Sequence, residues 1–163
     1  MSSFSQKYLP NLFPMNATDI IDLFKIGKAT AKSHMRNLIE MAAADGGLAD
    51  EEQRLLQYAA IRNNISDLEL KEIQADVSKI RFDVPSNEED KFTQLYDLVH
   101  MMSVDKNIHG EELRLCEIFA IKFGYRKEVV RQMIEMIRQN IEKWIGPKET
   151  MRTVLKELKV YDR

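Results

Sequence analysis

The sequence predicts an all-α protein, a compact single-domain helical bundle of about eight helices with two pseudo-symmetric helix-loop-helix repeats. Three observations lead to this fold class. The 163 residues, 44% of them hydrophobic, are enough to build one buried core. From Thr18 onward, apolar residues recur at helical spacing, and no segment alternates as a strand does. The third observation is an internal repeat that relates two stretches of the chain.

Breaks in the helical pattern define the individual elements. Glycine, asparagine and proline occur where helix ends are expected, as in 45–47 and 146–147. Pro147 suits the first turn of a helix, where its missing N–H is not needed. Residues 1–17 lack any period, so an extended N-terminal leader is expected before a single domain over 18–163. The expected helices cover 18–26, 28–44, 50–62, 67–79, 86–104, 111–123, 127–145 and 147–158.

The internal repeat appears when the chain is shifted by 60 residues (101 minus 41). Nine positions are then identical, pairing Leu38, Met41, Asp45, Glu51, Glu52, Arg54, Leu55, Ala60 and Ile61 with Leu98, Met101, Asp105, Glu111, Glu112, Arg114, Leu115, Ala120 and Ile121. Two copies are too few for a solenoid, whose inner repeats need neighbours on both sides. We therefore expect two units, 35–79 and 95–139, that face each other across one core.

Each repeat contains an acidic corner between two helices, formed by Asp45 and Glu52 in the first copy and by Asp105 and Glu112 in the second. Each aspartate follows a helix C-terminus, where the helix dipole disfavours a carboxylate, so it needs N–H groups, a basic side chain or a cation. Each glutamate falls in the first turn of the next helix, within reach of a cap N–H.

Two interpretations of these corners stay open. In the first, the carboxylates brace a tight helix-loop-helix corner. In the second, they form a weak divalent-cation site, because Ca²⁺ and Mg²⁺ prefer carboxylate and carbonyl oxygens. Apart from such a weakly bound divalent cation, no cofactor is expected.

The run Ala43-Ala44-Asp45-Gly46, followed by Leu48 and Glu52 and repeated around Asp105, resembles the TerB-like family associated with tellurite resistance. A similar helical domain is found in DnaJ-like membrane co-chaperones. The resemblance covers about residues 28–139 and implies an all-helical domain with pseudo-twofold repeats. It implies no established catalytic activity, a stress-response role in complexes near membranes, and an acidic metal site. The family signature maps onto Asp45 with Glu52 and Asp105 with Glu112.

Charge and cysteine content narrow the possible functions. With 24 Lys+Arg against 26 Asp+Glu, the net charge of -2 excludes a generally basic nucleic-acid binder. The single Cys116 allows no intrachain disulfide, which favours a cytoplasmic location. The basic residues of 147–158 are diluted by Glu149 and Glu157, so at most peripheral membrane association is expected.

The sequence contains no motif for nucleophilic catalysis or phosphate binding. We therefore expect a non-enzymatic interaction module with a protein partner, and the oligomeric state stays open.

Three further residues carry expectations about burial. Cys116 aligns with Leu56 of the other repeat, which predicts a small hydrophobic side chain in the core. His100 aligns with Glu40, which predicts a solvated helix position. Trp144 is expected to pack at the boundary of the core.

Overall fold

A computed structural model describes residues 17–44, 49–104, 108 and 110–162, and these residues form an all-helical bundle without a strand among them. The described part contains seven α-helices and one 3-10 turn: α2 (Ala17–Ala43), α3 (Asp50–Arg62), α4 (Asp67–Ala75), η1 (Val77–Lys79), α5 (Glu88–Ser103), α6 (Gly110–Lys122), α7 (Lys127–Glu142) and α8 (Pro147–Glu157). The predicted all-α fold class is confirmed.

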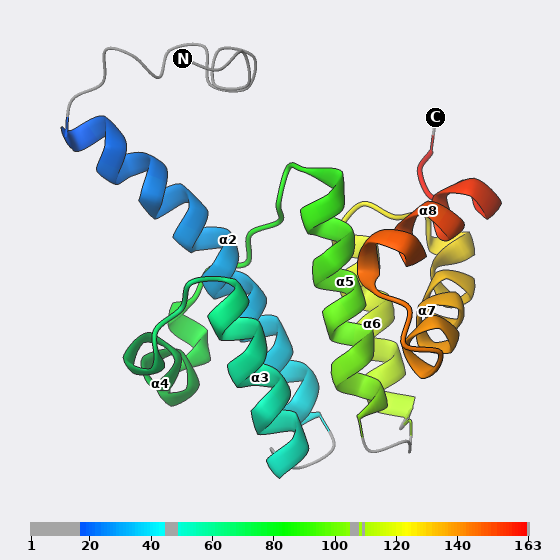
Figure 1. The fold of residues 1–163 in the computed structure, drawn as a ribbon, viewed down its shortest axis with the longest axis horizontal. Coiled ribbons are helices and arrows are strands. Elements are labelled where there is room, and N and C mark those ends of the chain that lie inside the picture. Colours follow the sequence, from blue (N-terminus) through cyan, green and yellow to red (C-terminus); the bar gives the residue numbers. More distant parts are fainter. Residues whose placement is uncertain (1–16, 45–48, 105–107, 109, 163) are drawn as a thin grey trace.

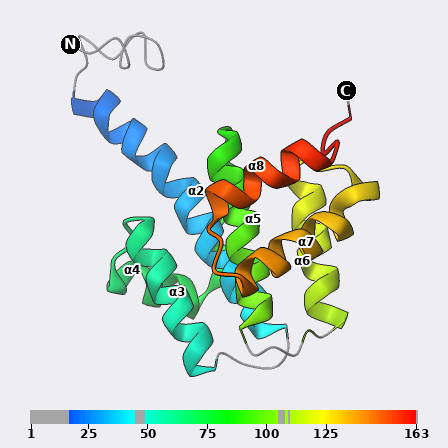
Figure 2. The same cartoon turned by 45° about the vertical axis from the view of Figure 1, so that its right-hand side comes forward.

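Two halves make up the molecule. Figure 1 shows α2, α3 and α4 in one half and α5 to α8 in the other, and Figure 2, after a turn of the molecule, shows α3 and α4 on one side of α5, and α6 and α7 on the other. In the described residues, no helix has both the length and the apolar character that a membrane crossing requires.

The described residues form seven α-helices where about eight were expected, because the helices expected over 18–26 and 28–44 are one, and the other differences lie at helix ends. The break expected near Gly27 is absent, and α2 runs through it from Ala17 to Ala43. A single glycine inside a helix costs only about 1 kcal/mol relative to alanine, so the helical pattern on both sides overrides it. The helix expected over 67–79 ends at Ala75, because Asp76 accepts a hydrogen bond from the backbone N–H of Ser78 and starts η1. Of the leader expected over 1–17, Ala17 is the first residue of α2, and 1–16 lie outside the described residues.

The repeat in the sequence is also a repeat in the structure. Helix α6 begins and ends 60 residues after α3, and α7 begins 60 residues after α4. Equivalent apolar positions are buried in both halves, namely Leu38 and Leu98, Met41 and Met101, Leu56 and Cys116, Ala60 and Ala120, and Ile73 and Met133. Because the same positions are buried in both copies, the two units bury equivalent faces in one continuous core.

The two halves also end their second helices in the same way. The N–H of Ile65 donates to the carbonyl of Ala60, and the N–H of Tyr125 donates to the carbonyl of Ala120. The residues before them, Asn64 and Gly124, have positive φ angles of 57° and 98°. Asparagine and glycine are the two residue types that suit this left-handed helix end.

A buried charge connects the halves. The carboxylate of Asp97 on α5 lies 2.8 Å from His34 Nε2 on α2 and 2.5 Å from an Arg62 nitrogen on α3. Asp97 is only 5% exposed. Burial alone would raise the pKa of Asp97, but the hydrogen bond and charge of His34, together with Arg62, hold it below its ordinary value. One anion therefore holds three helices from both halves.

The position equivalent to Asp97 in the other repeat carries no charge. At the 60-residue offset, Asp97 corresponds to Asn37, and His34 corresponds to Gln94. All four residues are buried. The Asn37 amide and Gln94 Oε1 have no hydrogen-bond partner among the described residues. Of the two equivalent buried pairs, only one therefore contains a carboxylate.

The substitution Asp97→Asn is expected to lower the free energy of unfolding by about 3 kcal/mol, because it leaves His34 and Arg62 without their shared anion. Urea denaturation at pH 7 measures this change. The control Glu72→Gln, on the exposed face of α4, should change stability by less than about 0.5 kcal/mol.

Acid should remove the same stabilisation. Because the pKa of Asp97 is lowered by folding, its contribution is complete above about pH 4 and is lost as the pH falls through the folded-state pKa. The stability difference between the native chain and Asp97→Asn should therefore shrink only below about pH 4. A difference already absent at neutral pH would contradict this role.

Candidate functional site

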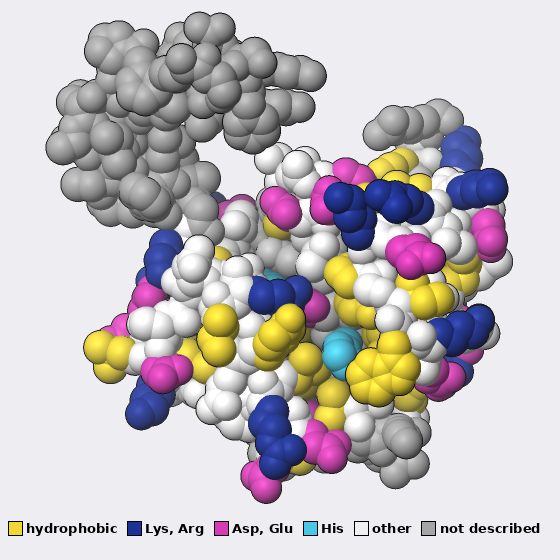
Figure 3. All heavy atoms as spheres, in the orientation of Figure 1, with side chains coloured by type: hydrophobic (Ala, Val, Ile, Leu, Met, Phe, Trp, Pro, Cys, Tyr) yellow, Lys and Arg dark blue, Asp and Glu magenta, His cyan; other side chains and the backbone are white. Residues whose placement is uncertain are grey.

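A groove runs between the halves, with α3 on one side and α5 and α7 on the other. It has a larger part of about 880 Å³ and a smaller part of about 420 Å³. Helices α3 and α5 line both parts, since Leu55 and Tyr96 face the larger one and Arg62 and Asp97 the smaller one. We call the two parts together the inter-repeat groove. Figure 3 shows this central hollow with hydrophobic side chains on both sides.

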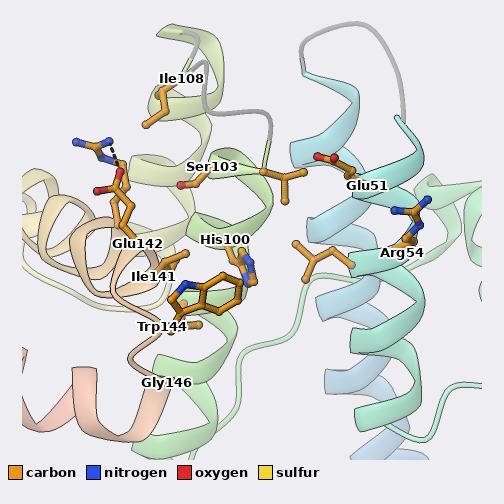
Figure 4. Close-up of a pocket in the computed structure, with 13 residues that line it drawn as sticks. Glu51, Arg54, His100, Ser103, Ile108, Ile141, Glu142, Trp144 and Gly146 are labelled. Atoms are coloured by element: carbon orange, nitrogen blue, oxygen red, sulfur yellow. Dashed lines mark hydrogen bonds and ion pairs between the residues drawn. The ribbon is translucent and has the colours of Figure 1, made fainter.

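The larger part has an apolar lining and a charged rim. Its apolar side chains are Leu55, Val104, Ile108, Ile141 and Trp144. Figure 4 shows Glu51 and Arg54 on the α3 side of this part. On the α7 side, Arg138 donates to Glu142 over 3.3 Å. The cavity is therefore an apolar trough edged by charges of both signs.

Trp144 is the most exposed large hydrophobic residue of the described chain, with 96% of its surface open to solvent. It is also the only tryptophan in the sequence. Its φ of 61° is left-handed, at the position after α7 that Asn64 and Gly124 occupy after α3 and α6. A bulky side chain at such a position costs about 1 kcal/mol relative to glycine. The expectation of boundary packing was wrong, because this turn directs the indole outward.

Tyr96 fixes the turn that carries Trp144. The Tyr96 hydroxyl donates to the carbonyl of Ile145 over 2.7 Å, which ties the turn to α5. His100 lies one helical turn further on, and its ring meets the Tyr96 ring edge-on with centroids 6.3 Å apart. Figure 4 shows the indole of Trp144 beside His100. The three aromatic rings thus form one wall of the larger part.

His100 is half-buried, so the expected solvated position was wrong. Burial lowers the pKa of His100; the charge of Asp97 opposes this shift and that of Arg62 adds to it. The imidazole is therefore neutral at pH 7. In this state it adds a polar but uncharged group to the apolar trough.

The smaller part of the groove is polar. Asp97 and His34 contribute to its lining, with Thr93, Asn63 and Asp90 closer to the surface. A carboxylate–imidazole pair also occurs in hydrolases, where the second ring nitrogen activates a nucleophile. Here His34 Nδ1 is buried and has no hydrogen-bond partner among the described residues. The geometry therefore supports a structural hydrogen bond between the imidazole and the carboxylate at this position.

The acidic corners are only partly within the described residues. Asp45 and Asp105 lie outside them. Glu52 is 5% exposed, and its Oε1 accepts the backbone N–H of Ala49 over 3.2 Å, as the capping interpretation expects. Glu112 is 2% exposed in the first turn of α6.

No group of three or more His, Cys, Asp or Glu side chains in the described part is placed to hold a metal ion. The cation site built from Asp45, Glu52, Asp105 and Glu112 stays a prediction.

Cys116 is buried in the core, as expected. Burial raises the pKa of its thiol, and the charge of Glu117 adds to this effect. The thiol is therefore protonated and inaccessible, and it is not a nucleophile.

Sequence reasoning missed the residues that define the groove. Arg62 corresponds to Lys122 at the 60-residue offset, and no local motif indicates that Arg62 meets Asp97. The alignment of Asn37 with Asp97 was the available signal, because it places a polar residue on the buried face of both copies. The sequence contains no such signal for the exposure of Trp144, because this exposure depends on the direction of a single turn.

No protein-family model, curated protein or solved structure matches this chain. The TerB-like resemblance therefore stays an expectation based on the acidic corners.

Replacing Glu52 should reveal its capping role. We expect Glu52→Ala to lower the free energy of unfolding by at least about 1 kcal/mol, because it removes the acceptor for the Ala49 N–H. The matched variant Glu51→Ala removes an exposed neighbour and should change stability by less than about 0.5 kcal/mol. Equal losses in the two variants, measured by urea denaturation, would remove Glu52 from this role.

Trp144 fluorescence should report the protonation of His100. Because the pKa of His100 is lowered, we expect the indole emission to change only below about pH 6.5, as an imidazolium forms beside the ring. His100→Gln should abolish this transition, and His109→Gln should keep it. A transition that survives in His100→Gln, or one centred above the ordinary histidine pKa, would contradict the assignment.

Proposed function

We propose that this chain is a non-enzymatic protein-interaction domain that binds its partner in the inter-repeat groove, with Trp144 as the anchor. The exposure of Trp144 is the observation that carries the proposal. Tryptophan is highly buried on average in folded proteins, and it is enriched among the residues that contribute most to binding energy. A nearly bare indole beside an apolar trough has the composition of an unpaired binding surface.

The backbone at Trp144 supports the same proposal. Glycine or asparagine would suit the left-handed turn better, as they do after the two equivalent helices. Local strain of this kind is typical of functional positions, where a side chain is retained against its conformational preference. The charged rim of Glu51, Arg54 and Glu142 surrounds the apolar centre, an arrangement found in many protein interfaces.

The resemblance to TerB-like domains suggests the cellular process in which this domain would bind its partner. It implies a stress-response role linked to tellurite resistance, in complexes near membranes. The groove supplies a surface through which such a complex would be assembled.

Selection of displayed random peptides on the immobilised chain tests the proposed function. We expect peptides that shift the Trp144 emission on binding and lose at least tenfold in affinity with Trp144→Ala. A matched variant, Leu68→Ala, removes an exposed hydrophobic residue on α4 and should leave the affinity unchanged. Selected peptides that bind Trp144→Ala as well as the native chain would contradict the proposal.

The stability of Trp144 variants should show whether the indole serves binding or packs against the fold. We expect Trp144→Gly to raise the free energy of unfolding by about 1 kcal/mol, because glycine relieves the left-handed backbone. Trp144→Ala keeps a Cβ atom and should gain nothing, while both variants lose binding. If either variant unfolds more readily than the native chain by more than about 1 kcal/mol, the indole packs against the fold instead.

A further inference from the structure

The partner of the inter-repeat groove can be inferred from a segment of the chain itself, an argument that rests on the proposed function. Residues 80–85 connect η1 to α5 without forming a helix or strand. They cross a surface formed by α2 and α6. By the 60-residue offset, α2 corresponds to α5 and α6 to α3, so this covered surface is the counterpart of the open groove between α5 and α3.

The covered surface holds the segment through its backbone and one ring. Arg36 Nη1 donates to the carbonyl of Ile80 over 2.8 Å, and the N–H of Asp83 donates to Ser33 Oγ over 2.8 Å. The ring of Phe82 stacks on Phe119, with centroids 6.4 Å apart. The Phe123 ring also stacks on Phe82, with centroids 6.1 Å apart. Lys122 Nζ lies 5.0 Å from the centroid of the Phe82 ring.

The open groove retains two of the groups that bind this segment. Thr93 corresponds to Ser33 and supplies a hydroxyl, while Arg62 corresponds to Lys122 and supplies a cation. The hydroxyl of Thr93 donates to the Glu89 carbonyl, so its oxygen can accept an N–H from a ligand. Tyr96 corresponds to Arg36, but its hydroxyl already donates to the chain's own Ile145 carbonyl, so Thr93 and Arg62 are the two corresponding groups that remain for a ligand.

The differences between the two surfaces leave space in the open groove. Ala59 and Asn63 stand where Phe119 and Phe123 stand on the covered surface. With Asn63 in place of the Phe123 ring, the smaller part, of about 420 Å³, lies beside Asn63 and Arg62. The guanidinium of Arg62 is 31% exposed and already lies 5.3 Å from the Tyr58 ring, so an aromatic ring can stack beside it.

Opposite charges mark the two ends of the groove. Arg54 is exposed at the larger part and Asp90 at the smaller part, and neither forms an ion pair with another described residue. The covered segment runs from Ile80 at Arg36 to Asp83 at Ser33. An equivalent ligand therefore runs from Arg54 toward Asp90, so an acidic N-terminal residue and a basic C-terminal residue complement the groove.

We infer that the inter-repeat groove binds an extended peptide segment of a partner protein, with an aromatic side chain beside Arg62, an acidic residue near Arg54 and a basic residue near Asp90. The length follows from the helices. From Ser103 to Asp90, α5 rises about 20 Å, which an extended peptide spans with about six residues. A segment of about six to eight residues fills the groove.

A synthetic peptide tests this inference directly. Acetyl-Glu-Ile-Ser-Phe-Ser-Val-Pro-Lys-amide keeps the apolar pattern of residues 80–85 and adds the two end charges. We expect saturable binding to the full chain, followed by Trp144 emission and by the anisotropy of a labelled peptide. Exchanging the two end charges should weaken binding at least fivefold, and replacing the phenylalanine by alanine should weaken it at least tenfold.

Matched protein variants locate the peptide. Thr93→Val should weaken binding about fivefold, because it removes the acceptor that corresponds to Ser33 Oγ. Thr153→Val is the control, since Thr153 also donates to the carbonyl four residues before it, but on α8. If the peptide shows no saturable binding up to millimolar concentration, the inference is overturned. It is also overturned if neither Thr93→Val nor the exchange of the peptide's end charges changes the affinity.

A helical comparator separates this inference from the proposed function. An amphipathic leucine-rich helical peptide that binds in a Trp144-dependent manner, while the extended peptide does not, would overturn the extended ligand and leave the interaction function intact. Binding of the extended peptide with full dependence on Thr93 and Trp144 supports both.

Discussion

The buried carboxylate of Asp97 is the interaction on which the arrangement of the two halves depends. It belongs to α5, yet both of its cationic or polar partners come from the other half, His34 from α2 and Arg62 from α3. A buried charge is strongly destabilising unless it is paired and hydrogen-bonded, so the three helices are constrained to one relative position. That position sets the width of the groove between α3 and α5.

The groove itself arises because two similar units have different connections. After α4, the chain crosses the surface between α2 and α6 and covers it with Phe82. After α7, the chain instead turns at Trp144 and enters α8, so the equivalent surface between α5 and α3 stays open. The same turn directs the indole outward beside the larger part of the groove (Figure 4). Duplication thus gives the chain one satisfied surface and one available surface.

Much of this fold can be predicted from the sequence, because helix periodicity and the repeat both depend on local spacing. The positions of α3 and α6 and the capping position of Glu52 follow from residues near each other in the chain, and the burial of Cys116 follows from its alignment with Leu56 in the other repeat. The length of α2 was harder to predict, since one glycine is a weak break compared with continued apolar spacing.

The candidate site was less predictable because it depends on contacts between distant residues. The repeat alignment makes Asn37 the equivalent of Asp97, but it does not show that Arg62 reaches the Asp97 carboxylate. The exposure of Trp144 and the burial of His100 both follow from how one turn is tied to Tyr96. The acidic corners dominated the sequence pattern, while the groove has no local motif.

The most direct test of the central claim is nuclear magnetic resonance of the Trp144 indole. The chain has a single tryptophan, so its indole N–H gives one assigned signal without ambiguity. During titration with a selected ligand, we expect this signal to move together with backbone amides of α3 and α5 that line the inter-repeat groove. Shifts confined to the acidic corners or the outer face of α4, with the indole signal unmoved, would contradict the claim that this groove is the binding surface.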